Sequence, residues 1–173
     1  YMFSEEGENP LLLLRDRRDE WKQNFSLFSL NTTIDLSSKL TLTLQGDLQQ
    51  TYRKRMSYAK AGLQDVSENN GGYADIYNYD NQKMSSENYF TYNDEYLSGL
   101  LRSEFVLGAS WYYNRSESSS SGSEQFFDDS FGYHNLSAGT TWHEPTSGMD
   151  QNTMNSYYFR MNHNIKDRYL LGA

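Results

Sequence analysis

The chain has 173 residues, a net charge of −8 and a mean hydropathy of −0.85, and it lacks cysteine. The acidic balance argues against a nucleic-acid partner, whose groove needs clustered lysine and arginine. The longest apolar run, Leu11 to Leu14, is far shorter than the ~20 residues of a transmembrane helix. Helical membrane proteins and disulfide or thiolate-metal frameworks are therefore excluded, whereas β-barrels, which need apolar residues only at alternate positions, are not.

The first predicted element is a β-hairpin between residues 30 and 48. Leu30, Thr32, Ile34 and Leu36 alternate with polar residues, and after Ser37-Ser38-Lys39 the alternation resumes with Leu40, Leu42, Leu44 and Leu48. Period-two alternation is typical of a strand with two different faces, and a short polar link between two such runs indicates a tight turn. We expect Leu40, Leu42 and Leu44 to face lipid, and Thr41, Thr43 and Gln45 to face a wet lumen.

Further alternating runs follow at roughly 87–97, 102–116 and 156–165, and a last run begins at Arg168. Ser98-Gly99 and Lys166-Asp167 predict tight turns, whereas roughly 53–86 and 117–152 are long polar stretches that we interpret as extracellular loops. The connections therefore alternate between short and long. In an up-and-down meander this alternation places all short turns at one end of the sheet and all long loops at the other, as in outer-membrane barrels.

The predicted fold class is therefore all-β, an antiparallel up-and-down meander that forms part of a large transmembrane β-barrel in the cell outer membrane. Residues 1–173 would supply about five to six strands. The smallest membrane barrels use about eight strands. We therefore expect the chain to be a fragment whose barrel is completed by strands outside it.

Candidate ligand-binding residues are the aromatic side chains of the two polar stretches, because sugar rings stack on aromatic faces. They are Tyr73, Tyr77, Tyr79, Phe126, Phe127, Tyr133 and Trp142. The same rings could instead pack the loops against each other or against a partner protein.

No catalytic or cofactor site is predicted, since no serine elbow, phosphate loop or dinucleotide fingerprint occurs. His134, His143 and His163 lack metal-ligand spacing. Asp128 and Asp129 lie near Glu124, but a solvated acidic loop explains them better than a Ca²⁺ site. We therefore expect neither an enzyme nor a metal site.

The last eighteen residues, Ser156 to Ala173, read SYYFRMNHNIKDRYLLGA. This segment resembles the mid-barrel hairpin of SusC-type TonB-dependent transporters, which has a pattern like SYFGRLNYNYKDRYLL; Phe159 and His163 depart from that pattern. The resemblance implies a 22-stranded outer-membrane barrel that imports oligosaccharides or peptides. It also implies a SusD-like surface lipoprotein over the barrel mouth, and energy from TonB, ExbB and ExbD. The plug domain and the TonB-contacting segment would lie outside this chain.

Two other hypotheses stay open at this point. A soluble all-β carbohydrate-binding or adhesin module would bury its leucines against a second sheet. A barrel that acts only as an assembly scaffold would share the strands but not the transport activity.

Overall fold

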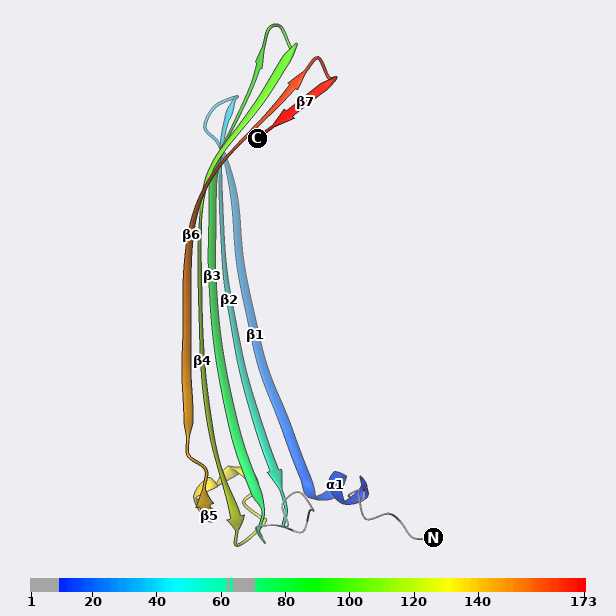
Figure 1. Cartoon of the computed structure of the whole chain (residues 1–173), viewed down its shortest axis with the longest axis vertical. Helices are drawn as coiled ribbons and strands as arrows, with labels where there is room; N and C mark the ends of the chain where they lie inside the picture. Colours follow the sequence, from blue (N-terminus) through cyan, green and yellow to red (C-terminus); the bar gives the residue numbers. More distant parts are fainter. Residues whose placement is uncertain (1–9, 62, 64–70) are drawn as a thin grey trace. The chain divides into compact units, whose positions relative to one another are not determined.

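The computed structural model describes residues 10–61, 63 and 71–173, which form one antiparallel sheet with three short helical segments (Figure 1). The helical segments are α1 (Pro10–Asp16) and the 3-10 turns η2 (Gly132–His134) and η3 (Leu136–Ala138). The strands are β1 (Arg17–Asp35), β2 (Leu40–Ala59), β3 (Tyr73–Tyr96), β4 (Leu101–Phe126), β5 (Gly139–Trp142), β6 (Thr146–Ile165) and β7 (Tyr169–Gly172). Within the described ranges, no helix has the length and hydropathy needed to cross a membrane.

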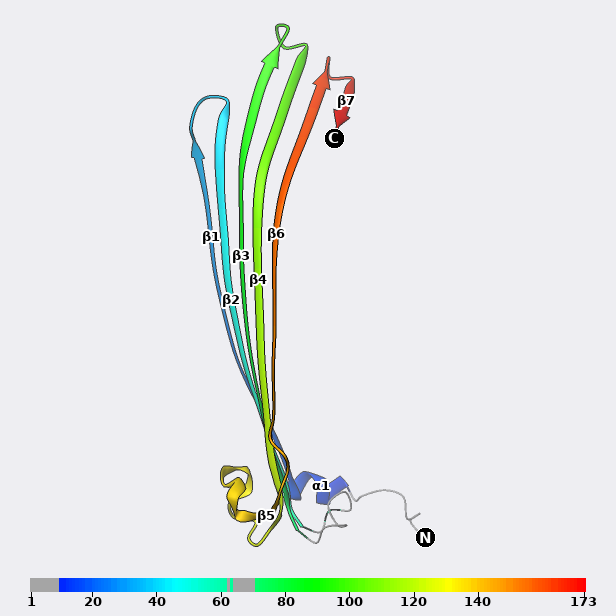
Figure 2. The same ribbon diagram turned by 60° about the vertical axis from the view of Figure 1, so that its left-hand side comes forward.

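The strands follow each other in the order β1-β2-β3-β4-β6-β7, with β5 paired to β4. Figures 1 and 2 show the five long strands side by side in both views. The predicted all-β antiparallel meander is thus confirmed, and the sheet does not close on itself within the described residues. α1 was not predicted from the sequence.

The three predicted tight turns are also confirmed. β1 ends at Asp35 and β2 begins at Leu40, where the Leu36 and Ser37 N–H groups donate to the Leu40 carbonyl at 2.9 and 3.1 Å. The other two turns lie between β3 and β4 and between β6 and β7. At residues 166 and 167 both turn residues have positive φ, 55° and 53°, as the central residues of a type I′ turn do.

The chain divides into two compact units, and each long strand contributes residues to both. Unit 1 contains Tyr1–Phe25, Thr51–Asn81 and Ser116–Asp150; unit 2 contains Ser26–Gln50, Gln82–Arg115 and Gln151–Ala173. All three tight turns belong to unit 2, and both longer connections, after β2 and after β4, belong to unit 1. The predicted sorting of short and long connections is therefore confirmed.

The predicted bounds of the two long loops are wrong. β2 extends to Ala59 and β3 begins at Tyr73, inside the stretch 53–86; β4 extends to Phe126 and β6 begins at Thr146, inside 117–152. The apolar alternation fades in these stretches, but the ladder hydrogen bonds join backbone groups and need no apolar side chain. Tyrosine also favours strands. Asn69 and Asn70, part of a predicted turn, lie outside the described residues.

In unit 2 the two faces of the sheet differ largely as expected, although Leu40 and Leu42 are half-buried. Leu44 and Leu48 are 36% and 40% exposed, and on β4 Leu107 is 59% exposed. Tyr92, Phe105 and Phe159 share this apolar face across β3, β4 and β6, because the Phe105 ring lies 6.4 Å from each of the other two. Thr43, expected to face open water, is buried under neighbouring side chains.

Unit 1 has a small apolar core on one side of the sheet. Its buried members are Met56, Tyr58, Ala74, Phe126 and Tyr133. The first three lie at alternate positions of β2 and β3, whereas Tyr133 comes from the connection after β4. That connection therefore covers one face of the sheet in unit 1, and its His143 contacts Tyr73 on the other face.

Candidate functional site

The face of unit 1 opposite the apolar core carries arginine and tyrosine side chains from neighbouring strands. Because successive strand residues point to opposite faces, Arg53 and Arg55 of β2 lie opposite the core residues Met56 and Tyr58. Tyr73, Tyr77 and Tyr79 occupy alternate positions of the neighbouring strand β3. The contact between Arg53 and Tyr79 shows that both sets share one face, which we call the arginine–tyrosine face.

Arg55 is fully engaged within this face. Its Nε and Nη2 atoms donate to the two carboxylate oxygens of Asp19 on β1, at 3.0 and 2.6 Å. The guanidinium also lies over the Trp21 ring, 5.4 Å from its centroid. A bidentate pair of this kind neutralises the cation and fixes its plane, so Arg55 joins β1 to β2.

Arg53 is held differently. Its Nε donates to the Gln23 side-chain oxygen at 3.0 Å, and its guanidinium carbon lies 5.8 Å from the centroid of the Tyr79 ring. Among the described residues, no carboxylate forms an ion pair with Arg53. The guanidinium is thus oriented by a neutral amide and a ring, and its charge is not balanced by a partner.

On the covered face, two tyrosine hydroxyls attach the connection after β4 to the sheet. The Tyr58 hydroxyl donates to Asp129 at 2.5 Å, and the Tyr133 hydroxyl donates to Glu20 at 2.6 Å. The bond to the Glu20 carboxylate, together with burial, raises the pKa of Tyr133 above its usual value. The edge of the Phe126 ring also contacts Tyr58, with centroids 5.7 Å apart.

The seven predicted ligand-binding aromatics fall into three groups. Tyr73, Tyr77 and Tyr79 are half-buried on the arginine–tyrosine face, where the Tyr73 ring lies 5.3 Å from His143. Phe126 and Tyr133 are buried in the core of unit 1, where neighbouring side chains cover their rings. Phe127 and Trp142 are 98% and 71% exposed. The structure therefore gathers three of the seven on one face of the sheet.

Unit 2 has a polar network on the face opposite its apolar one. Tyr158 of β6 lies across Gly108 of β4 and donates its hydroxyl to Glu87 of β3 at 2.7 Å. On the same face, Glu104 accepts hydrogen bonds from Arg160 and Asn162 at 3.3 and 2.9 Å. Three adjacent strands are thus joined by charged and polar side chains.

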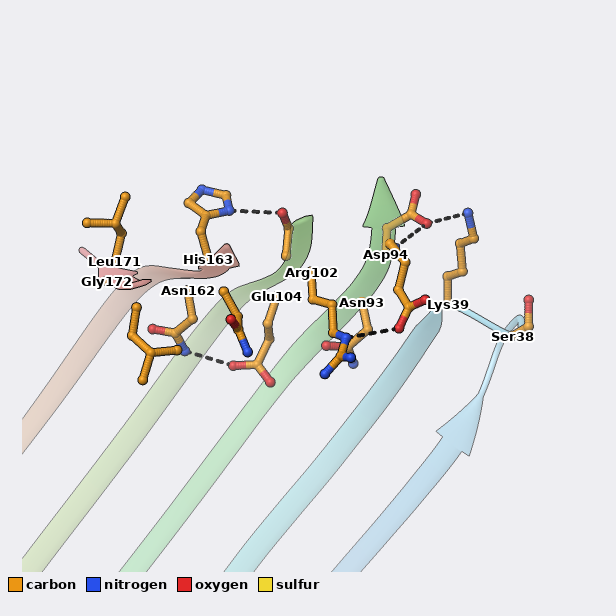
Figure 3. A pocket seen from close by; sticks show the side chains of 14 residues that line it. Ser38, Lys39, Asn93, Asp94, Arg102, Glu104, Asn162, His163, Leu171 and Gly172 are labelled. Atoms are coloured by element: carbon orange, nitrogen blue, oxygen red, sulfur yellow. Dashed lines mark hydrogen bonds and ion pairs between the residues drawn. The ribbon is translucent and has the colours of Figure 1, made fainter. Parts of the chain in front are cut away.

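A depression near the tight turns of unit 2 is lined by fourteen residues, and Figure 3 shows their side chains on both sides of the sheet. Asp94 and His163 project to one side, where His163 pairs with the Ser103 hydroxyl. Asn162 and Glu104 project to the other. A single ligand cannot reach both groups, so this depression is not a candidate site.

Asp128, Asp129 and the two histidines of the connection after β4 have local partners. Asp128 accepts the Ser130 backbone N–H and hydroxyl, both at 2.8 Å, and these bonds lower the pKa of its carboxyl. Its neighbour Asp129 is bonded to Tyr58 instead. His143 lies 3.5 Å from Glu124, whereas the His134 ring lies 4.5 Å from Tyr133. Across the described ranges, no group of three or more His, Asp or Glu side chains is arranged to hold a metal ion.

Sequence reasoning missed the two arginines of the arginine–tyrosine face. A signal was available, because Arg53 and Arg55 have the same parity as Thr41, Thr43 and Gln45 on the same strand. The polar stretch from residue 53 onward is interpreted as a loop from the sequence alone, so these two arginines are not assigned there to a face of the strand.

Neither a protein-family model nor a curated protein matches the sequence. The solved structures that resemble its fold include three of RagAB. Structures of the RagAB peptide importer in "open-open" and "closed-closed" states match 91% of the chain, with TM-scores of 0.81 and 0.78 and 16% identity. A structure of the RagAB peptide transporter matches 94%, with a TM-score of 0.83 and 15% identity. The chain spans only 17–18% of the length of those solved chains.

Proposed function

We propose that this chain is part of the wall of an outer-membrane β-barrel transporter of the SusC type, which imports oligosaccharides or peptides. Two features of the sheet carry the proposal. It has an exposed apolar face, and its tight turns all belong to unit 2 whereas its longer connections all belong to unit 1. In unit 2, Leu30, Leu107 and Phe159 are each between 58% and 59% exposed. The opposite face of unit 2 carries a network of charged and polar side chains. This difference is expected of a barrel wall, whose outer face contacts lipid and whose inner face contacts water.

The resemblance of Ser156–Ala173 to the SusC hairpin and the shared fold of the RagAB structures support the same assignment. Peptides are the cargo named for those solved proteins. The complete barrel would contain 22 strands and a plug. TonB, ExbB and ExbD would act through parts outside this chain, and a SusD-like lipoprotein would cover the extracellular mouth.

The longer connections of unit 1 would lie on the extracellular side in this arrangement. The arginine–tyrosine face would then line the outer part of the lumen, because Arg53 and Arg55 share strand parity with the lumen-facing Gln45. Cargo entering the barrel would pass Tyr73, Tyr77 and Tyr79, and Phe127 and Trp142 would reach cargo or the lipoprotein from the loop.

The soluble carbohydrate-binding or adhesin module is less well supported. A β-sandwich packs a second sheet onto the apolar face of the first. The described residues form a single sheet, and Leu30, Leu107 and Phe159 on that face are exposed rather than buried.

A pair of adjacent substitutions in the full-length protein tests the proposal. Cells lacking the gene would be complemented with the wild type, Leu30→Arg or Asn31→Arg, and uptake of labelled oligosaccharides and peptides would be measured. We expect Asn31→Arg to restore uptake, because residue 31 faces the lumen. Leu30→Arg should fail to accumulate in the outer membrane, because an arginine in the hydrocarbon costs up to about 2–4 kcal/mol.

Uptake that is unchanged by deletion of the gene would contradict the transport function. Equal assembly of both arginine variants would contradict the barrel.

A further inference from the structure

We propose that Arg53 is a cargo-binding residue that recognises the terminal carboxylate of a peptide. The proposal rests on the proposed function and adds the chemical group that the cargo must carry. It starts from the difference between the two arginines of the arginine–tyrosine face. Arg55 has its carboxylate in Asp19, whereas Arg53 has none among the described residues.

The two contacts of Arg53 leave the part of the guanidinium that binds carboxylates open. Gln23 accepts a hydrogen bond from Nε only. The guanidinium carbon lies over the Tyr79 ring, and this contact uses none of the N–H groups. No hydrogen bond from Nη1 or Nη2 of Arg53 is formed within the described part of the chain. These terminal nitrogens form a planar pair of donors, which matches the two oxygens of a carboxylate.

The side chain is also oriented before cargo arrives. An exposed arginine normally loses rotamer freedom when it binds, which weakens the interaction. Here the amide of Gln23 on β1 and the ring of Tyr79 on β3 hold Arg53 between two neighbouring strands. Less entropy is therefore lost when a carboxylate is bound.

The neighbouring groups suit the rest of a short peptide. Tyr77 and Tyr79 lie at alternate positions on the same face as Arg53 and offer half-buried rings for side-chain contact. Of the acidic residues nearby, Asp19 pairs with Arg55, whereas Asp75 accepts only the neutral Ser120 hydroxyl, at 3.4 Å, and forms no ion pair with Arg53 in the described part of the chain. An arriving carboxylate would therefore meet a cation whose charge no neighbour cancels.

The test uses the purified full-length transporter, with its surface partner if one co-purifies. The probe is an N-acetylated random pentapeptide library of Ala, Ser, Leu, Tyr and Gln, made once with a free terminal carboxylate and once with a terminal amide. Retained peptides are quantified by mass spectrometry. We expect the wild type to retain the carboxylate form about tenfold to a hundredfold better, as a charged hydrogen-bonded pair implies.

Arg53→Gln should abolish this preference, and Arg53→Lys, which keeps the charge but loses the planar pair of donors, should keep only part of it. Lys54→Gln is the matched control, because it removes the same charge from the adjacent residue on the opposite face of β2. It should retain the full preference. The heat-dependent gel shift of a folded barrel identifies any variant that fails to fold, and Arg53→Lys then carries the test.

Three results would overturn the proposal: equal retention of the two peptide forms, no retention of either by the wild type, or a preference that survives Arg53→Gln. A carboxylate preference seen only with uronic-acid oligosaccharides, measured in a parallel arm, would overturn the assignment to peptides. Cargo uptake by cells is measured separately. Uptake without carboxylate preference rejects this inference alone, whereas no uptake of any cargo rejects the proposed function.

Discussion

At the scale of single residues, Gly108 is the position where a neighbouring side chain leaves the least room. A Cβ atom built on Gly108 would lie 2.7 Å from Cε1 of Tyr158 and closer still to Cζ. The aromatic ring thus occupies the space that a side chain on β4 would fill, and its hydroxyl reaches past β4 to Glu87 on β3. The Tyr158 ring over Gly108 and the Tyr158–Glu87 hydrogen bond together link β6, β4 and β3 and help to fix their register.

We predict that Gly108→Ala destabilises the barrel by about 1–3 kcal/mol, because the added methyl group displaces the Tyr158 ring. In a Tyr158→Ala background the same change should cost less than about 0.5 kcal/mol, since the obstacle is gone. Urea unfolding of the full-length protein in lipid vesicles measures both differences. An equal cost in the two backgrounds would show that Tyr158 is not what requires a glycine at this position.

Individual residues also mark where sequence reasoning was sufficient and where it was not. The parity of Leu44 and Leu107 followed from local alternation, which is why their exposed face was predicted. The burial of Phe126 and Tyr133 depends on the connection after β4 folding back onto β2, and no local pattern encodes that contact. The same holds for Tyr158 and Gly108, which are fifty residues apart in the chain.

At the scale of elements, the tight turn between β6 and β7 has two consecutive residues with positive φ, but neither is a glycine or an asparagine. Lys166 and Asp167 both adopt positive φ, which is unfavourable for a lysine and better tolerated by asparagine or glycine. Asp167 also joins the turn to its neighbours, because it accepts hydrogen bonds from Asn164 and Arg102 at 2.9 and 3.3 Å.

Lys166→Asn should therefore stabilise the barrel by about 0.5–1 kcal/mol, because asparagine adopts this conformation at lower cost. Arg168→Asn is the matched control, since it removes a charge two residues away at a position without positive φ. Urea unfolding midpoints compare the two variants. A loss of stability in Lys166→Asn would show that the lysine side chain makes a contribution that the turn geometry does not explain.

The elements that were predicted correctly are those whose two faces meet different surroundings. The hairpin of β1 and β2 and the run of β4 from Phe105 to Tyr113 carry an apolar face, which makes the alternation visible. The extensions of β2, β3 and β4 within unit 1 carry polar residues and tyrosines on both faces, so the period-two signal disappears although the backbone pairing continues. The lengths of these strands could not be predicted for that reason.

At the scale of the whole molecule, the proposed function requires one asymmetry: one face of the sheet would contact lipid and the other would contact water. Residues 30–35 are suited to test it, because apolar and polar residues alternate there on β1 and all six are exposed. Because this chain contains no cysteine, a single introduced cysteine is the only thiol in it that a maleimide can label.

The decisive measurement introduces one cysteine at a time at positions 30 to 35 of the full-length protein, freed of any other cysteine and assembled in lipid vesicles. Each is tested with a water-soluble maleimide and with a lipid-borne fluorescence quencher. The account predicts a strict period of two: Leu30, Thr32 and Ile34 are quenched by lipid and poorly labelled, whereas Asn31, Thr33 and Asp35 are labelled and not quenched. Uniform labelling of all six positions, without quenching at any of them, would contradict it.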